Sequence, residues 1–402
     1  MTPRPLLSTR FKYFAAIDLL CSFAEEVLVV AVGWYVYEQT KSAFALGMIG
    51  LAGFLPAMLL SLVTGLAADR FDRRTILLLC NVLLASGAGL LCLITLQPSI
   101  VAVYAVIVLM GSGKAFLGPV LKAILPNIVE SENLSRALAF TGSTSEAAKL
   151  FAPALGGVLY AFGPAVPFTV GGIAFALSAL MALGVGPCRP EKGEPLSRIE
   201  TLIGGYRFIW SKPIVLGAMS LDFVAVLLGG ATALLPIFVD QIFHSGPWAL
   251  GVLRAAPAAG ALVMAGLLAM VPLRRRVGRR LLWSVAIYGC ATIGFALSTN
   301  LVVAFCCMMA IGAADTVSQI IRQSLVQLQT PDSMRGRVSA VHTFVAGGSN
   351  EIGQFESGIL AAVVGAIPAI LIGGVGAVMA ALAWAWLFPD IRAADRMTGD
   401  PE

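Results

Sequence analysis

Ala45-Leu46-Gly47 recurs as Ala249-Leu250-Gly251, and Asp18 recurs as Asp222, at the same offset of 204 residues in a chain of 402. An internal repeat at about half the chain length indicates the duplication of one structural unit. Both aspartates lie within long apolar stretches, where a charge is energetically costly and is by default a functional candidate. The repeat therefore predicts two similar halves with one carboxylate at a matching depth in each, and it favours a role in transport.

The composition is that of a membrane protein. Hydrophobic residues make up 58% of the chain, charged residues 12%, and the mean hydropathy is +0.89, which excludes a water-soluble domain with an ordinary surface. Apolar runs of about 20 residues are typical of helices that cross the bilayer. The sequence predicts an all-α membrane protein with twelve transmembrane helices in two pseudo-symmetric six-helix bundles. The predicted spans lie near residues 12–37, 44–68, 75–97, 99–124, 137–162, 165–187, 213–240, 247–272, 281–298, 300–326, 338–366 and 367–388.

The distribution of Lys and Arg predicts the orientation of these spans. With the N-terminus inside, the outside loops contain only Lys41, whereas the inside segments contain all the other loop cations. Both termini are therefore expected in the cytoplasm, in a multi-pass protein of the bacterial inner membrane. The net charge of +5 follows from this asymmetry, so it indicates no nucleic-acid partner.

The longest polar connection, residues 188–212, separates the sixth predicted span from the seventh. Its apolar residues recur at helical spacing, which is typical of a helix lying in the membrane interface. We therefore expect an N-terminal six-helix bundle over residues 1–187, a cytoplasmic linker with an interfacial helix over 188–212, and a C-terminal six-helix bundle over 213–402.

Four acidic residues within the predicted spans are candidates for proton coupling: Asp18, Glu26, Asp222 and Glu351. Asp222 lies roughly 15 Å into its span at the rise of an α-helix, and Asp18 mirrors it. Burial favours the protonated form of a carboxylate, whereas a nearby cation favours the ionised form. An acid whose surroundings alternate between water and protein can therefore load and release a proton in step with transport.

Further charges within the spans are candidates for partners of these acids or for the wall of a central cavity. Arg254 needs a partner, for which Asp222 or Glu351 is the expected choice. Asp315 and Arg322, seven residues apart, share one face of their predicted helix. Each pair could instead be a structural contact between helices. The charge-partner and cavity candidates are Lys114, Lys149, Arg254, Asp315, Arg322 and Glu356.

Lys114 is the most distinctive cavity candidate, because a lone ammonium would favour an anionic substrate group such as a catecholate or a carboxylate. Glu146 is the alternative, structural partner for it, although Glu146 also lies at a spacing that suits a pair with Lys149. His244 and His342 have no companions at metal-ligand spacing and are interpreted as surface residues. The sequence therefore predicts no metal site and no cofactor.

At the cytoplasmic end of the second span stands Gly65-Leu66-Ala67-Ala68-Asp69-Arg70-Phe71-Asp72-Arg73-Arg74. This stretch resembles the Gly-x-Leu-x-Asp-Arg-x-Gly-Arg-Arg signature of the major facilitator superfamily. The resemblance implies a cytoplasmic gate whose contacts exist in only one of two conformations. Asp72 departs from the pattern, because the family usually has Gly there. The gate residues implied are Gly65, Asp69, Arg70, Arg73 and Arg74.

A second stretch, Pro153-Ala154-Leu155-Gly156-Gly157, resembles the Gly-Pro-x-x-Gly-Gly signature of exporters in this superfamily, with Ala152 in place of the first Gly. The resemblance implies export and a helix bend formed by Pro153, Gly156 and Gly157, while close packing of small residues is the alternative explanation. Over nearly its whole length the chain looks like the bacterial branch that contains the enterobactin exporter and macrolide or multidrug efflux pumps. That branch implies alternating access and proton-driven export of a small organic molecule.

These features predict a secondary transporter rather than an enzyme, and the sequence contains no nucleotide-binding loop. The leading hypothesis is proton-coupled export of a siderophore-like or drug-like molecule by a monomer in contact with membrane lipids. The main alternative is an importer, a facilitator or a lipid flippase on the same fold. A transport-inactive receptor or scaffold is the remote alternative, because such a protein does not need paired charges inside the membrane.

Overall fold

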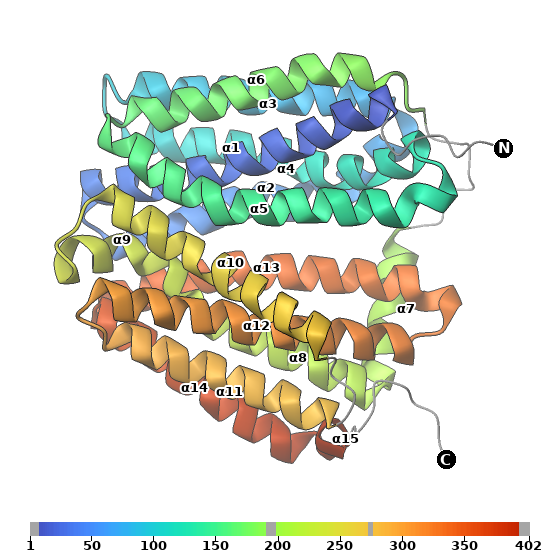
Figure 1. Cartoon of the computed structure of the whole chain (residues 1–402), viewed down its shortest axis with the longest axis vertical. Helices are drawn as coiled ribbons and strands as arrows, with labels where there is room; N and C mark the ends of the chain where they lie inside the picture. Colours follow the sequence, from blue (N-terminus) through green and yellow to red (C-terminus); the bar gives the residue numbers. More distant parts are fainter. Residues whose placement is uncertain (1–7, 190–197, 272–275, 394–402) are drawn as a thin grey trace. The chain divides into compact units, whose positions relative to one another are not determined.

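A computed structural model describes residues 8–189, 198–271 and 276–393, and the regular elements in these ranges are all helices (Figure 1). The first half contains α1 (Thr9–Thr40), α2 (Ala43–Arg70), α3 (Arg73–Ile94), α4 (Ile100–Ile128), the short η1 (Ser131–Asn133), α5 (Leu134–Ala161) and α6 (Ala165–Val185). The second half contains α7 (Arg198–Ser211), α8 (Pro213–Leu228), η2 (Gly230–Leu234), α9 (Leu235–Ile237), η3 (Phe238–Ile242), α10 (Pro247–Met270), α11 (Val277–Ala296), α12 (Leu301–Gln329), α13 (Asp332–Val364), α14 (Ala366–Leu387) and α15 (Pro389–Ala393).

Eight helical segments in the described ranges are long and apolar enough to cross a membrane. They are α2, α3, α4, α6, the segment that begins with α8, α10, α12 and α14. The long helices α1, α5, α11 and α13 lie outside this set. Three of these four carry acids predicted to lie inside the membrane, for example Asp18 and Glu26 on α1 and Glu351 on α13. Such helices can occupy lipid only if their charges face protein or water.

Contacts between helices divide the chain into two compact units. Unit 1 comprises Met1–Lys41, Ile49–Gly193 and Ser245–Ala255, and unit 2 comprises Ser42–Met48, Glu194–His244 and Ala256–Glu402. Each unit therefore combines one half of the chain with a short segment of the other half. The short segments are the first turns of α2 and α10, which contain the two copies of the repeated tripeptide.

Unit 1 is organised around α1, α3 and α6. Helix α6 packs against both α1 and α3, while α5 packs against α1 and α4 packs against α3. Large side chains such as Ile17, Leu84 and Phe168 are fully buried there. Small residues bring helices closer still, since a Cβ on Gly111 of α4 would lie 2.5 Å from the carbonyl oxygen of Gly53 on α2. In lipid, close packing of this kind holds helices together because the membrane supplies little hydrophobic driving force.

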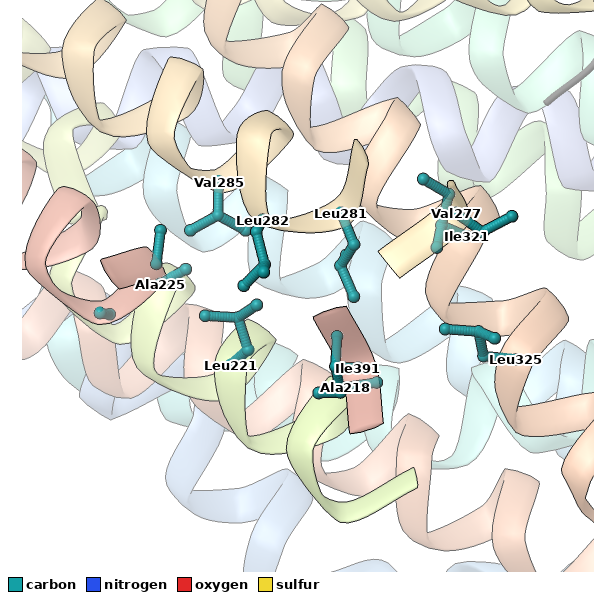
Figure 2. Packing of buried hydrophobic residues seen from close by; sticks show 12 residues of the cluster. Ala218, Leu221, Ala225, Val277, Leu281, Leu282, Val285, Ile321, Leu325 and Ile391 are labelled. Carbon is teal, nitrogen blue, oxygen red and sulfur yellow. The ribbon is translucent and has the colours of Figure 1, made fainter. Parts of the chain in front are cut away.

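Unit 2 has its main core where α8, α11, α12 and α14 meet. Figure 2 shows the centre of this core, where Leu221 on α8 and Leu281 on α11 lie among other buried aliphatic side chains. Ile321 and Leu325 extend the same core along α12. Helices α12 and α14 pack directly against α8, which also carries Asp222.

The seventh predicted span is not one continuous α-helix. After α8 ends at Leu228, the chain passes through a 3-10 segment, a short α-turn and a π-helical turn before it reaches residue 242. A Cβ on Gly229 would lie 2.0 Å from Oη of Tyr288, and one on Gly230 would lie 2.5 Å from the carbonyl oxygen of Gly353. The Tyr288 hydroxyl donates a hydrogen bond to the Gly229 carbonyl at 3.2 Å. Irregular backbone at membrane depth is tolerated where neighbouring helices bury and satisfy it in this way.

The two copies of the repeated tripeptide mark two tight helix crossings. In unit 2, a Cβ on Gly47 at the start of α2 would lie 2.9 Å from Cα of Gly358 on α13. In unit 1, a Cβ on Gly251 at the start of α10 would lie 2.3 Å from the carbonyl oxygen of Pro153 on α5. Real Cβ atoms essentially never approach other atoms within 3.0 Å, so both crossings require glycine. Each unit therefore contains one equivalent crossing.

Candidate transport site

The most deeply buried charges in the described part of unit 2 form an ion pair between Asp222 on α8 and Arg322 on α12. Nη1 of Arg322 donates to Oδ1 of Asp222, and the two residues are only 4% and 8% exposed. Removing one partner of a buried pair leaves an uncompensated charge, which is far more costly than losing an exposed salt bridge. The pair therefore links α8 and α12 strongly for as long as both groups are ionised.

Arg322 has a second partner, His342 on α13. Its Nε donates to Nε2 of His342 at 3.3 Å, so this ring nitrogen carries a lone pair rather than a proton. Asp222, Arg322 and His342 together form what we call the buried charge cluster. The interpretation of His342 as a surface residue is wrong, because its ring is partly buried against Arg322.

A pocket of about 260 Å³ with both polar and apolar walls lies beside the buried charge cluster. His342 forms part of its wall, and the pocket extends along α12 and α13 towards the connection between these two helices. Its volume is enough for several water molecules, each of which takes up about 30 Å³ in the liquid. The lining residues are Gln323, Val326, Gln327, Thr330, Arg335, Val338, Ser339 and His342.

The equivalent carboxylate of unit 1, Asp18 on α1, has a neutral partner. Oγ of Ser145 on α5 donates to Oδ2 of Asp18 at 2.9 Å, and the Ser22 hydroxyl donates to Ser145 at 3.4 Å. The two repeated aspartates therefore lie in different surroundings, because one is bound to hydroxyl groups and the other to a guanidinium. Of the two, only Asp222 has an ion-pair partner among the described residues.

Unit 1 contains a second group of charges, more open than the buried charge cluster. Nζ of Lys114 on α4 lies 3.8 Å from Oε1 of Glu25 on α1. The predicted pair of Glu146 and Lys149 is present on α5, with Nζ donating to Oε1 at 2.7 Å. The charged neighbours of Glu26 are Arg254, Glu25, Lys114 and Lys149. We call these six residues, Glu25, Glu26, Lys114, Glu146, Lys149 and Arg254, the unit 1 charge group.

The structure assigns partners to charges that the sequence left lone or paired differently. Lys114 is not a lone ammonium, because Glu25 lies within ion-pair distance. The ion-pair partner of Asp222 is Arg322, which comes from a helix packed against α8. Asp315 and Arg322 lie on the same helix, but Arg322 pairs with Asp222 on α8 and Asp315 accepts a hydrogen bond from Gln319.

The other predicted acids have local hydrogen-bond partners. Oδ2 of Asp315 accepts from Gln319 at 2.7 Å. On α13, Glu351 accepts from Gln354 at 3.4 Å, and Glu356 accepts from the Ser357 hydroxyl at 3.5 Å. These three acids lie outside the buried charge cluster.

The proposed gate motif contributes contacts inside unit 1. Nη1 of Arg73 donates to the carbonyl oxygen of Ala123 on α4 at 2.9 Å, which joins the start of α3 to α4. Arg70 is exposed at the end of α2. The surroundings of Gly65 and the side chain of Asp69 lie outside the described part of the structure. In the described structure, Arg73 of this motif therefore joins two helices of unit 1.

Asp72, the departure from the family signature, caps α3. Its Oδ1 accepts from the backbone N–H of Arg74 at 3.1 Å and from the backbone N–H of Cys188, beyond the end of α6, at 2.9 Å. Burial, and secondly the nearby Asp72 carboxylate, raise the pKa of the Cys188 thiol. Glycine at this position would supply neither hydrogen bond, so the carboxylate has a structural role.

We expect Asp72→Ala to lower the free energy of unfolding by about 1–2 kcal/mol, because the cap and the link to Cys188 are both lost. Thermal denaturation in detergent micelles measures this loss. Asp72→Asn retains a side-chain carbonyl acceptor and should lose less. Equal stability of Asp72→Ala and the unaltered protein would contradict the capping role.

The helix-bend residues take part in tight packing between helices. Pro153 lies inside α5, and its carbonyl oxygen faces Gly251. A Cβ on Gly156 would lie 3.1 Å from the backbone of Val27 on α1, and one on Gly157 would lie 2.3 Å from the carbonyl oxygen of Pro247 on α10. The three residues thus let α5 approach α1 and α10 closely.

Comparison with known proteins establishes the family. Residues 2–400 match the family described as transmembrane secretion effector. The chain belongs to this family, a branch of the major facilitator superfamily, and it is a transporter of that type rather than an enzyme. It is 30% identical over 380 residues to the enterobactin exporter EntS of Citrobacter koseri, a match that covers 91% of this chain and 88% of the relative. The enterobactin exporter EntS of Escherichia coli (strain UTI89) is 30% identical over 371 residues, covering 89% and 83%.

Solved structures support the same fold at low sequence identity. A bacterial homologue of the human lysosomal transporter Spinster, in an inward-facing and unoccupied conformation, aligns with a TM-score of 0.78 and 16% identity over 99% of this chain and 100% of that chain. The nucleoside transporter NupG aligns with a TM-score of 0.76 and 14% identity over 95% and 99%. Together with the apolar helices, the family identifies a multi-pass membrane transporter with a small-molecule substrate.

Proposed function

We propose that this protein exports a small organic molecule, siderophore-like or drug-like, from the cytoplasm in exchange for protons. The relatives named enterobactin exporters support the direction and the substrate class. The observation that carries the proton coupling is the buried ion pair of Asp222 and Arg322. A nearby cation favours the ionised carboxylate, whereas burial without a cation favours the protonated one.

The proposed exchange of the organic molecule for protons depends on a change in the surroundings of Asp222 between two conformations. While Arg322 contacts it, Asp222 is held ionised and α8 is fastened to α12. When a proton neutralises Asp222, the attraction to Arg322 is lost and the two helices are released to move. Coupling therefore requires the ion pair to exist in one conformation and the protonated carboxylate in the other.

The proposal includes the full architecture predicted from the sequence. Twelve spanning helices form an N-terminal bundle over residues 1–187 and a C-terminal bundle over 213–402, joined by the linker 188–212, with both termini in the cytoplasm. The two bundles alternate in access around a central site, and the transporter acts as a monomer surrounded by lipid. The helical repeat and the single-sided distribution of loop cations support this arrangement.

The unit 1 charge group is the proposed binding site for an anionic part of the substrate. Lys114, Lys149 and Arg254 supply cations, and Lys114 and Lys149 are roughly half exposed in side-chain area. A catecholate or carboxylate could replace Glu25 or Glu146 as their partner at little electrostatic cost, because one anion is exchanged for another. Asp18, hydrogen-bonded to Ser145, lies on the same α1 helix as Glu25 and Glu26.

Uptake of enterobactin into inside-out vesicles with an imposed pH gradient tests the proposal. We expect gradient-dependent accumulation by the unaltered protein, a loss of about tenfold or more in Asp222→Asn, and normal uptake in Asp390→Asn, whose carboxylate is exposed on α15. Uptake that is independent of the gradient and equal in all three would instead favour a facilitator or a lipid flippase, with Asp222 as a structural charge. The same assay with a macrolide and a lipophilic cation defines the substrate class.

A further inference from the structure

His342 lies between the pocket along α12 and α13 and a buried ion pair. Its ring lines the pocket, and its Nε2 accepts a hydrogen bond from Arg322, which in turn binds Asp222. The sequence contains only one other histidine, His244, which is exposed after η3. Histidine is also the side chain that changes charge most readily near neutral pH. His342 therefore places a titratable side chain between the pocket and Arg322.

The hydrogen bond fixes the protonation state of His342 in this conformation. Nε2 can accept from Arg322 only while it holds a lone pair, so the imidazole is neutral. A proton on Nε2 would remove the acceptor and place a second cation beside the guanidinium. Protonation of His342 and the bond to Arg322 therefore exclude each other.

Among the ionisable groups on the helices around α13, Arg322 is the one that hydrogen-bonds to His342. Within the described side chains, Asp222 is the sole ionisable group of α8, and it lies on the far side of Arg322. Arg335 lines the same pocket as His342. Helix α14 and η2, which pack against α13, contain no ionisable residue. The other ionisable groups with described side chains on α7, α12 and α13 are Tyr206, Arg207, Cys306, Cys307, Asp315, Arg337, Glu351 and Glu356.

We propose that His342 is a positioning residue through which protons in the pocket control the Asp222–Arg322 pair. Neutral His342 holds Arg322 in place against Asp222. A proton passed from a pocket water to Nε2 breaks the bond to Arg322 and repels the guanidinium, which weakens its hold on Asp222. Return of the proton to the pocket restores the arrangement, so no other reactant is consumed. The inference rests on the proposed proton coupling and adds the residue that transmits it.

A transport experiment separates this role from a structural one. Proteoliposomes containing the full chain are assayed with enterobactin in two modes, gradient-driven uptake and counterflow at equal pH on both sides. We expect His342→Gln to retain counterflow, because the amide oxygen can still accept from Arg322, and to lose about tenfold in gradient-driven uptake. Its uptake should also lose its dependence on pH between about 5 and 8. The matched control, His244→Gln, should behave as the unaltered protein in every assay.

Loss of both modes in His342→Gln would overturn the proposal in favour of a structural role. Unchanged uptake with an unchanged pH profile would overturn it as well. Absence of gradient dependence in the unaltered protein would instead contradict the proposed function. A second measurement distinguishes failure of the role of His342 from failure of that function.

That second measurement follows the imidazole itself. In a His244→Gln chain, His342 is the only histidine, and its protonation can be followed by NMR in detergent micelles. We expect Asp222→Asn to shift the titration of His342 measurably, because the charge of Arg322 is then no longer balanced. An unchanged titration would show that His342 does not sense the ion pair, whatever the transport assays give.

Discussion

Arg322→Ala is expected to lower the free energy of unfolding by about 3–5 kcal/mol and to abolish gradient-driven transport. The loss is large because Asp222 would remain buried without its cation and His342 without its donor. Thermal denaturation in micelles and vesicle uptake measure the two effects. Arg392→Ala, which removes an exposed guanidinium from α15, should change stability by less than about 0.5 kcal/mol.

A double substitution separates the two consequences of losing Arg322. Adding Asp222→Asn to Arg322→Ala removes the unbalanced charge, so most of the stability should return while transport stays absent. If Arg322→Ala is as stable as Arg392→Ala, the ion pair is not buried as described. If the double variant transports, the pair is not needed for coupling.

Gly251→Val is expected to have the second-largest effect. Its Cβ would lie 2.3 Å from the carbonyl oxygen of Pro153, so α10 and α5 would be forced apart, at a cost of about 1–3 kcal/mol. Gly47→Val should act similarly on the equivalent crossing of α2 and α13, where the Cβ would lie 2.9 Å from Gly358. Because about 1.4 kcal/mol changes a conformational equilibrium tenfold, a cost of this size should lower transport by about fivefold or more. Vesicle uptake together with thermal denaturation measures both effects.

The same helix provides a matched control for this prediction. A Cβ on Gly266 of α10 meets no atom within 4 Å, so Gly266→Val adds the same side chain without the clash. This variant should keep nearly normal stability and transport. A similar loss in Gly251→Val and Gly266→Val would show that helix propensity, rather than the crossing, is responsible.

Much of the helical framework could be predicted from the sequence. The apolar run near 99–124 corresponds to α4, and the run near 165–187 corresponds to α6, because length and hydropathy determine where a chain can form such helices. The Glu146–Lys149 pair was predictable for a similar reason, since residues three apart on a helix are always neighbours. The break after Leu228 was not predictable, because Gly229 and Gly230 lie in an apolar run and their role depends on Tyr288 and Gly353 from other helices.

The partners of the buried charges could not be predicted from one sequence. Asp222 and Arg322 are 100 residues apart, and their contact depends on the packing of α12 against α8. His342 follows Arg322 by 20 residues but lies on the next helix, so no periodic pattern connects them. For Arg322, sequence reasoning therefore considered only Asp315 on the same helix. The sequence did offer one indication that His342 has a partner. It lies inside a long helical segment, where an ionisable side chain needs one.

The two repeated aspartates also bear on the ancestry of the chain. A half-length ancestor that paired with a copy of itself would have carried the same neighbours around both carboxylates, since one gene encoded both subunits. Here one carboxylate is bound by a serine and the other by an arginine, an asymmetry that becomes accessible only after the two copies are encoded separately. Duplication thus allowed the halves to specialise, whereas a homodimer of either half would contain two identical charge sites in place of two different ones.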